Sequence, residues 1–198
     1  MNTYIERCDE FKSLLKERLK EERYFHSLCV ADSARELARQ YGYNEDRAYM
    51  AGLLHDVTKN ENSENQLQML SDSAIILSQT EKNNFKLWHS MTAPIYVKKE
   101  LGIDDEEFLG ALRYHTTGKA NMSLLEMIVY IADYISAERD YPDVDVMRRL
   151  SKESLEKAAL YSLKYTLKKL SDGELVIHEN SLEFYNDLIL KGVTLGKD

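Results

Sequence analysis

Residues 51–60 read AGLLHDVTKN, and the doublet His55-Asp56 ends a segment that otherwise has the side chains of a buried helix. The positions that follow the spacing of one broad apolar stripe on a helix are Met50, Ala51, Leu54 and His55. An imidazole and a carboxylate are unusual side chains for such a face. The segment therefore predicts a buried helix whose end presents two polar groups to the protein interior.

Three more histidines, His26, His89 and His115, also lie on apolar helical faces. The residues that share these faces are Cys29, Val30, Ala34 and Leu37 beside His26, Ala93, Val97 and Leu101 beside His89, and Phe108, Ala111 and Leu112 beside His115. A single histidine in such a place is more often a core residue with a satisfied hydrogen bond than a ligand. Four of them in one short chain favour convergence on a common centre, since neutral imidazole is a good metal ligand.

The hydrophobic period is helical along nearly the whole chain. Helices are expected at 4–20, 22–41, 44–56, 88–101, 104–114, 123–137, 144–170 and 180–190, with short helices and loops over 60–87. The segment 144–170 is expected to be either one long helix or a broken one. Residues 173–179 could be extended but have no partner strand. The pattern predicts an all-α fold of about eight to ten helices in a single domain over residues 1–198.

Composition narrows the class of protein. The 198 residues are 43% hydrophobic and 30% charged, with two prolines and eight glycines, which favours helices over strand turns. The net charge of -8 argues against nucleic acid as a partner. No segment approaches a membrane span or resembles a signal peptide, and Cys8 and Cys29 form no disulfide framework. We expect a cytoplasmic protein with reduced thiols and no membrane partner.

Asp133 adds a carboxylate to the inward-facing histidines. It lies in SLLEMIVYIADYIS (123–136), which is apolar almost all round, as a fully buried helix would be. A buried carboxylate is costly unless it is paired or coordinated, so a salt bridge is the alternative to a metal-binding role. The candidate metal ligands are His26, His55, Asp56, His89, His115 and Asp133.

This set of six exceeds the needs of one tetrahedral ion and indicates two adjacent ions bridged by Asp56. Imidazole and carboxylate without thiolate suit iron, manganese, cobalt, nickel or zinc. One ion, with His89 and His115 positioning substrate instead, stays an alternative. His178 is left out, because it lies just before the cap of the last predicted helix, where a structural or surface role is expected.

The order H…HD…H…H…D resembles the HD superfamily of metal-dependent phosphohydrolases, and the closer resemblance is to its YqeK branch, the symmetrical dinucleoside tetraphosphate hydrolases. The segments that carry the resemblance are RYFHSLCVADSARELARQYG (23–42), AGLLHDVTK (51–59), LWHSMTAPIYV (87–97) and RYHTTGKANMSLLEMIVYIADYISAERDYPDVDVMR (113–148). It covers roughly residues 18–170, with a helical tail at 171–198.

This resemblance implies an HD-domain helical bundle around a di-iron type of centre. It also implies cleavage of diadenosine tetraphosphate into two ADP by a metal-bound hydroxide. By motif position, His26, His55, Asp56 and Asp133 match the ligands of a first ion, and Asp56, His89 and His115 those of a second. Asp56 and Lys59 are the expected catalytic residues, Lys59 matching a position near the phosphates.

The expected substrate-binding residues are cations and a turn near the motifs. They are Arg23, Lys59, Arg113, Thr116, Thr117, Gly118 and Arg139, with Lys119 as a further cation. Cations would neutralise phosphate charge, and a turn can donate hydrogen bonds to it. Solvated surface charge and ordinary turn chemistry are the structural alternatives.

Two other functions stay open at this point. The chain could be another HD phosphohydrolase that acts on nucleoside mono-, tri- or cyclic phosphates. It could also be a nucleotide-sensing helical domain with an inactive metal site, although none of the six ligand positions is missing. The sequence leaves the oligomeric state open, a homodimer included.

Overall fold

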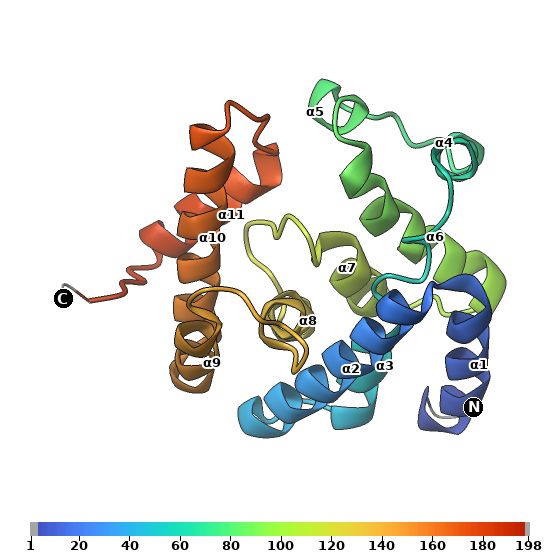
Figure 1. The fold of residues 1–198 in the computed structure, drawn as a ribbon, viewed down its shortest axis with the longest axis horizontal. Helices are drawn as coiled ribbons and strands as arrows, with labels where there is room; N and C mark the ends of the chain where they lie inside the picture. Colours follow the sequence, from blue (N-terminus) through green and yellow to red (C-terminus); the bar gives the residue numbers. More distant parts are fainter. Residues whose placement is uncertain (1–3, 197–198) are drawn as a thin grey trace.

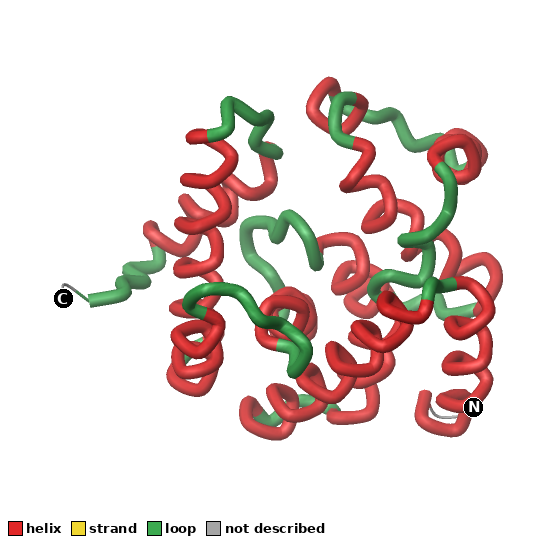
Figure 2. Tube along the Cα trace, in the orientation of Figure 1, coloured by secondary structure: helices red, strands yellow, loops and turns green. Residues whose placement is uncertain are grey.

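The computed structural model describes residues 4–196 and contains only helices, turns and loops over that range (Figures 1 and 2). The elements are η1 (Tyr4–Arg7), α1 (Cys8–Arg18), α2 (Glu21–Tyr41), α3 (Glu45–Leu54), α4 (Ser63–Asp72), α5 (Gln79–Lys82), η2 (Phe85–Leu87), α6 (Trp88–Leu101), α7 (Glu106–Tyr114), α8 (Leu124–Ile135), α9 (Val144–Glu153), α10 (Leu155–Asp172) and α11 (Glu179–Leu190). The all-α prediction is confirmed.

Helix α8 lies at the centre of the molecule, between α2, α3 and α7 on one side and α9 and α10 on the other (Figure 1). Every residue from Leu125 to Ala132 is buried. The helix begins with a capping box, in which the Ser123 hydroxyl accepts from the Glu126 backbone N–H and the Glu126 carboxylate accepts from the Ser123 N–H. Its apolar surface packs on all sides, which explains the continuous hydrophobic sequence.

Helices α2 and α3 pack very closely, and this brings two of the histidine-bearing segments together. A Cβ built at Gly52 would lie 3.0 Å from the Ala31 Cα and 3.0 Å from the Val30 carbonyl oxygen, so a larger residue would push the helices apart. The chain reverses between them at Gly42, which has a φ of 70°, and the Asn44 side chain caps α3 by accepting from the Arg47 N–H.

Two segments with open expectations are defined by the structure. The region 60–87 contains the short helices α4, α5 and η2, as expected. The segment 144–170, expected as a long or broken helix, is broken at Ser154, whose side chain accepts from the Lys157 N–H and starts α10. The described range contains eleven α-helices, one more than the eight to ten expected.

The C-terminal helix α11 packs back on the rest of the molecule. Phe184 is fully buried there and its ring contacts Tyr130 of α8 edge-on, with 5.5 Å between the ring centroids. Residues 173–179 form no strand. No helix in the described part of the chain is both long enough and apolar enough to cross a membrane.

Candidate metal centre

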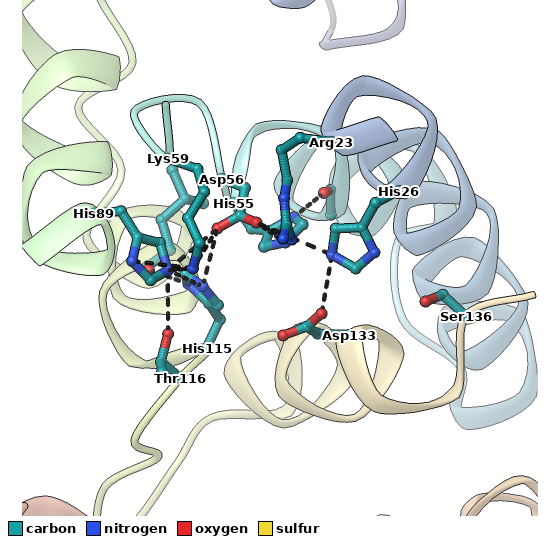
Figure 3. A network of polar contacts seen from close by, with 12 residues as sticks. Arg23, His26, His55, Asp56, Lys59, His89, His115, Thr116, Asp133 and Ser136 are labelled. Atoms are coloured by element: carbon teal, nitrogen blue, oxygen red, sulfur yellow. Dashed lines mark hydrogen bonds and ion pairs between the residues drawn. The ribbon is translucent and has the colours of Figure 1, made fainter. Parts of the chain in front are cut away.

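Five helices or the turns that directly follow them bring the six candidate ligands together around one point (Figure 3). His26 comes from α2, His55 and Asp56 from the turn after α3, His89 from α6, His115 from the turn after α7, and Asp133 from α8. The four histidines and Asp56 are buried, whereas the Asp133 side chain is 21% exposed. The expectation of full burial for Asp133 is therefore wrong, because the carboxylate faces a cavity rather than the core of apolar side chains.

His55 and His115 are oriented in the same way by the helices that end just before them. The Nδ1 atom of His55 lies 2.6 Å from the Gly52 carbonyl oxygen, and Nδ1 of His115 lies 2.8 Å from the Leu112 carbonyl oxygen. The last carbonyls of a helix have no intrahelical partner, so each accepts a hydrogen bond from the imidazole three residues later. Because a carbonyl only accepts, Nδ1 carries the proton, and the lone pair of each Nε2 atom points into the centre.

His26 sits inside α2, where no free carbonyl is available, and a side chain takes that role. Its Nδ1 atom forms a short hydrogen bond with Glu138, which also accepts from the Ser136 hydroxyl at 2.8 Å. The Nε2 atom is left facing Asp133, whose Oδ1 atom lies 3.1 Å away. Glu138 was not among the residues predicted from the sequence. The signal is faint, because it is one acidic residue in an irregular loop.

Asp56 lies between two groups of these side chains and directs one oxygen to each (Figure 3). Its Oδ2 atom is 3.4 Å from His55 Nε2 and 4.0 Å from His26 Nε2. Its Oδ1 atom is 3.2 Å from His89 Nε2 and 3.6 Å from His115 Nε2. One carboxylate can therefore serve two adjacent coordination sites.

The donor atoms fit a metal, because protein groups leave them unsatisfied. His26 Nε2, His55 Nε2 and Asp56 Oδ1 are buried and have no hydrogen-bond partner among the described residues. A buried polar atom without a partner costs about 1–3 kcal/mol, so several at one point indicate a ligand that the protein chain does not supply. In three overlapping groups, the ligand atoms lie within 4.8 Å of one another. These groups are His26, His55 and Asp56; His55, His115 and Asp133; and Asp56, His89 and His115.

Two carboxylates and one histidine of the centre have strongly shifted pKa values. Burial alone would raise the pKa of Asp56, but His55 and His115 outweigh it and hold the pKa well below its usual range. For Asp133, His26 and Arg139 are among the groups that outweigh burial in the same way. Burial lowers the pKa of His89 to about 3, so its ring is neutral.

Four of the predicted substrate-binding residues surround the centre. Arg23 Nη1 lies 2.8 Å from Asp56 Oδ2, and the Arg139 guanidinium pairs closely with Asp133. The Lys59 ammonium is 3.0 Å from His89 Nε2 and 3.9 Å from Asp56 Oδ1, and burial lowers its pKa. The Thr116 hydroxyl is 3.5 Å from His89 Nε2.

The other three, together with Lys119, have partners away from the centre. Arg113 pairs with Glu81 at 2.9 Å, and Lys119 pairs with Glu126 at 3.0 Å. The Thr117 hydroxyl donates to the Gly118 carbonyl, and the Thr117 carbonyl accepts from the Ser181 hydroxyl. A Cβ on Gly118 would lie 2.2 Å from the Phe184 ring. In this structure the Thr117-Gly118 turn joins the segment after α7 to α11.

His178, which the sequence excluded from the ligand set, caps the N-terminus of α11. Its Nδ1 atom accepts from the Asn180 N–H at 3.1 Å, and its Nε2 atom lies 3.5 Å from Glu81 Oε1. The side chain is buried. A structural role fits these contacts.

Relatives of known sequence share nearly the whole chain. The HD domain family matches residues 23–138, which include all six candidate ligands. The symmetrical bis(5'-nucleosyl)-tetraphosphatase of Halalkalibacterium halodurans is 36% identical over 178 residues, which are 90% of this chain and 95% of the relative. The enzyme of the same name from Bacillus subtilis is 33% identical over 181 residues, 91% of this chain and 97% of the relative.

A solved structure agrees. A Clostridium acetobutylicum protein, described as a predicted HD superfamily hydrolase involved in NAD metabolism, superposes with a TM-score of 0.91 at 39% identity. The match covers 96% of this chain and 99% of the other. The resemblance found in the sequence is confirmed. The chain belongs to the HD-domain family of hydrolases, within the group that contains the symmetrical bis(5'-nucleosyl)-tetraphosphatases.

Proposed function

We propose that this protein hydrolyses dinucleoside tetraphosphates symmetrically, converting diadenosine tetraphosphate into two ADP. We further propose that two divalent transition-metal ions bind at its His/Asp centre. Iron is the preferred metal, and manganese, cobalt, nickel and zinc are the alternatives. The printed activity of the relatives supports the reaction. The observation that carries the proposed centre is the division of the Asp56 oxygens between His26 and His55 on one side and His89 and His115 on the other.

The assignment of ligands follows from these two sides. His26, His55 and Asp133 would hold one ion, and His89 and His115 would hold the other. Asp56 would bind both ions, with one oxygen on each. Imidazole nitrogen and carboxylate oxygen without thiolate suit these metals. When bound, such ions neutralise charge on phosphoryl oxygens and lower the pKa of water toward neutrality.

We propose that the tetraphosphate binds in a cavity of about 510 Å³ beside the centre. Its lining includes three cations, Lys20, Arg23 and Arg139, after which we call it the cation-lined cavity, and three carboxylates, Glu22, Glu138 and Asp140. Guanidinium groups bind phosphate oxygens through two parallel hydrogen bonds, which fixes orientation as well as charge. The guanidinium groups of this cavity are those of Arg23 and Arg139, which pair with Asp56 and Asp133 in this structure.

Lys59 lies beside His89 and Asp56, and we propose that it acts on the substrate. It follows Asp56 by three residues in the same turn, and its ammonium reaches His89. Partial burial removes water from the ammonium, which lowers its pKa and strengthens its interaction with an incoming phosphate oxygen. We assign Lys59 to charge neutralisation during attack at phosphorus.

The test is incubation of the iron- or manganese-loaded protein with diadenosine tetraphosphate, with the products separated by chromatography. ADP alone is expected. Asp56→Asn keeps the size of the side chain but removes its charge, and the rate should fall by about a hundredfold or more. The control Asp145→Asn changes a 91% exposed carboxylate and should behave as the wild type. AMP plus ATP as products, or an active Asp56→Asn variant, would contradict the proposal.

A further inference from the structure

A second cavity, of about 330 Å³, lies between the end of α8, the loop after it, α9 and α10. Cavities that bind small molecules commonly start near this volume and are largely apolar with a few polar groups. Tyrosine is the most frequent side chain in its lining, whereas the cavity beside the centre is lined mainly by charged side chains. The two cavities therefore suit different parts of a ligand.

Helix α10 forms one wall of this tyrosine-lined cavity. Tyr161, Tyr165 and Lys169 are spaced four residues apart, so they follow one face of the helix. Tyr165 is 54% exposed, which is unusual for an aromatic ring whose role is core packing. No carboxylate in the described part of the chain pairs with Lys169, so its ammonium is available to a ligand.

The opposite wall is held in place by hydrogen bonds. It comprises Tyr134 at the end of α8 and Tyr141 and Pro142 in the following loop, which runs from α8 towards α9 (Figure 1). The Tyr141 hydroxyl donates to the Tyr134 carbonyl at 2.9 Å, and Arg148 donates to the carbonyls of Ser136 and Arg139, both at 3.1 Å. A loop tied down in this way offers a preformed surface, which reduces the entropy lost on binding.

This cavity adjoins the candidate metal centre. Asp133, one of the candidate ligands, lines it directly. Arg139 and Tyr141 line both this cavity and the cation-lined one. A molecule whose charged part lies against Arg139 can therefore place an uncharged, flat part against the tyrosines.

We propose that the tyrosine-lined cavity binds a nucleoside of the substrate, with the base against the ring of Tyr165 and the polyphosphate passing Arg139 into the cation-lined cavity. The proposal rests on the proposed function for the identity of the substrate. Every nucleobase has a π-face that stacks on an aromatic side chain, whichever hydrogen-bonding groups the base carries on its edges. Tyr165 is then a residue that selects nucleotides over inorganic polyphosphate.

The experiment compares two probes that differ only by adenosine. ADP and pyrophosphate are titrated calorimetrically into the manganese-loaded full chain, as wild type, Tyr165→Ala, Tyr165→Phe and the control Phe85→Ala. Phe85 is a similarly exposed aromatic residue outside the cavity lining. Tyr165→Ala should weaken ADP binding by about tenfold or more, and pyrophosphate binding by less than about twofold. Tyr165→Phe keeps the ring and should bind ADP as the wild type does, as should Phe85→Ala.

Equal ADP affinity in the wild type and Tyr165→Ala would overturn the nucleoside subsite, and so would an equal loss for ADP and pyrophosphate. The assay also separates this proposal from the proposed function. A protein that fails to cleave diadenosine tetraphosphate but binds ADP in a Tyr165-dependent way keeps the subsite and loses the function. A protein that cleaves it while ADP binding ignores Tyr165 keeps the function and loses the subsite.

Discussion

Asp56 shows why the histidine and aspartate of the doublet are adjacent. His55 uses a free helix-end carbonyl to fix its ring, and the next residue leaves the helix with its two oxygens facing different neighbours. The helical period of the sequence placed all four histidines on inward faces, and all four are buried. The number of candidate ligands predicted that Asp56 serves two sites, but which histidines face each of its oxygens depends on how α2, α6 and α7 pack and could not be predicted.

Glu138 is the residue that sequence reasoning missed. Its partner His26 is 112 positions earlier in the chain, and the contact joins a helix interior to an irregular loop. Burial would raise the pKa of Glu138, but hydrogen bonds from His26 and Ser136 outweigh it and lower the pKa. An ionised carboxylate behind a histidine holds its tautomer and makes the other nitrogen more basic.

Glu138→Gln should therefore weaken metal binding while leaving the fold intact. The amide can still accept from His26, but it lacks the negative charge, and loss of such a partner reduces metal affinity by about tenfold to a hundredfold. Manganese affinity measured by titration checks this, with Glu153→Gln as the control, since Glu153 pairs only with neighbours on the surface of its own helix and the next. Unchanged affinity in Glu138→Gln would show that His26 needs no carboxylate partner.

The boundaries of a helix could be predicted from the sequence where a local capping residue marks them, and not elsewhere. Gly42, Asn44 and Gly102 mark ends that follow local chemistry, and the helices there begin and end where expected. A break within 144–170 was one of two expectations, but its position at Ser154 was not predicted, because the hydrophobic period continues through it and a side-chain cap starts the next helix. Short helices were expected over 60–87, but they are too brief for their hydrophobic period to give their bounds.

The turn after α7 offers a test of whether Gly118 has a structural role. Its φ of 64° is unfavourable for other residues, and a Cβ there would meet the buried Phe184 ring. Gly118→Ala should lower the free energy of unfolding by about 3 kcal/mol, from backbone strain plus steric overlap. Gly42→Ala is the matched control, with a φ of 70° and open space around it, and should cost about 1 kcal/mol.

Chemical denaturation of both variants measures the difference. A similar loss of stability in the two would mean that the backbone conformation alone matters and that Phe184 yields to the added methyl group. A larger loss in Gly118→Ala would place the requirement for glycine in the contact between this turn and α11. Either result is independent of substrate, which separates packing from the phosphate-binding role that the sequence predicted for this position.

The whole molecule places two cavities on either side of Arg139, and neither could be found from the sequence. Each cavity is lined by segments from three or more parts of the chain, including the loop 136–143. The all-α class and the convergence of the histidine- and aspartate-bearing segments followed from periodicity and from the polar residues on apolar faces, whereas the choice of substrate followed from the family resemblance. The residues by themselves left any metal-dependent phosphohydrolase open, because substrate choice depends on the cavities.

The number of metal ions per chain tests most directly whether Asp56 joins two sites. Full-length wild type, His26→Ala and His89→Ala are loaded with manganese, desalted and measured by mass spectrometry of the metal. We predict about two ions per chain in the wild type and about one in each variant, because each substitution removes a ligand from only one side of Asp56. One ion per chain in the wild type, lost in His26→Ala and retained in His89→Ala, would contradict the two-ion centre.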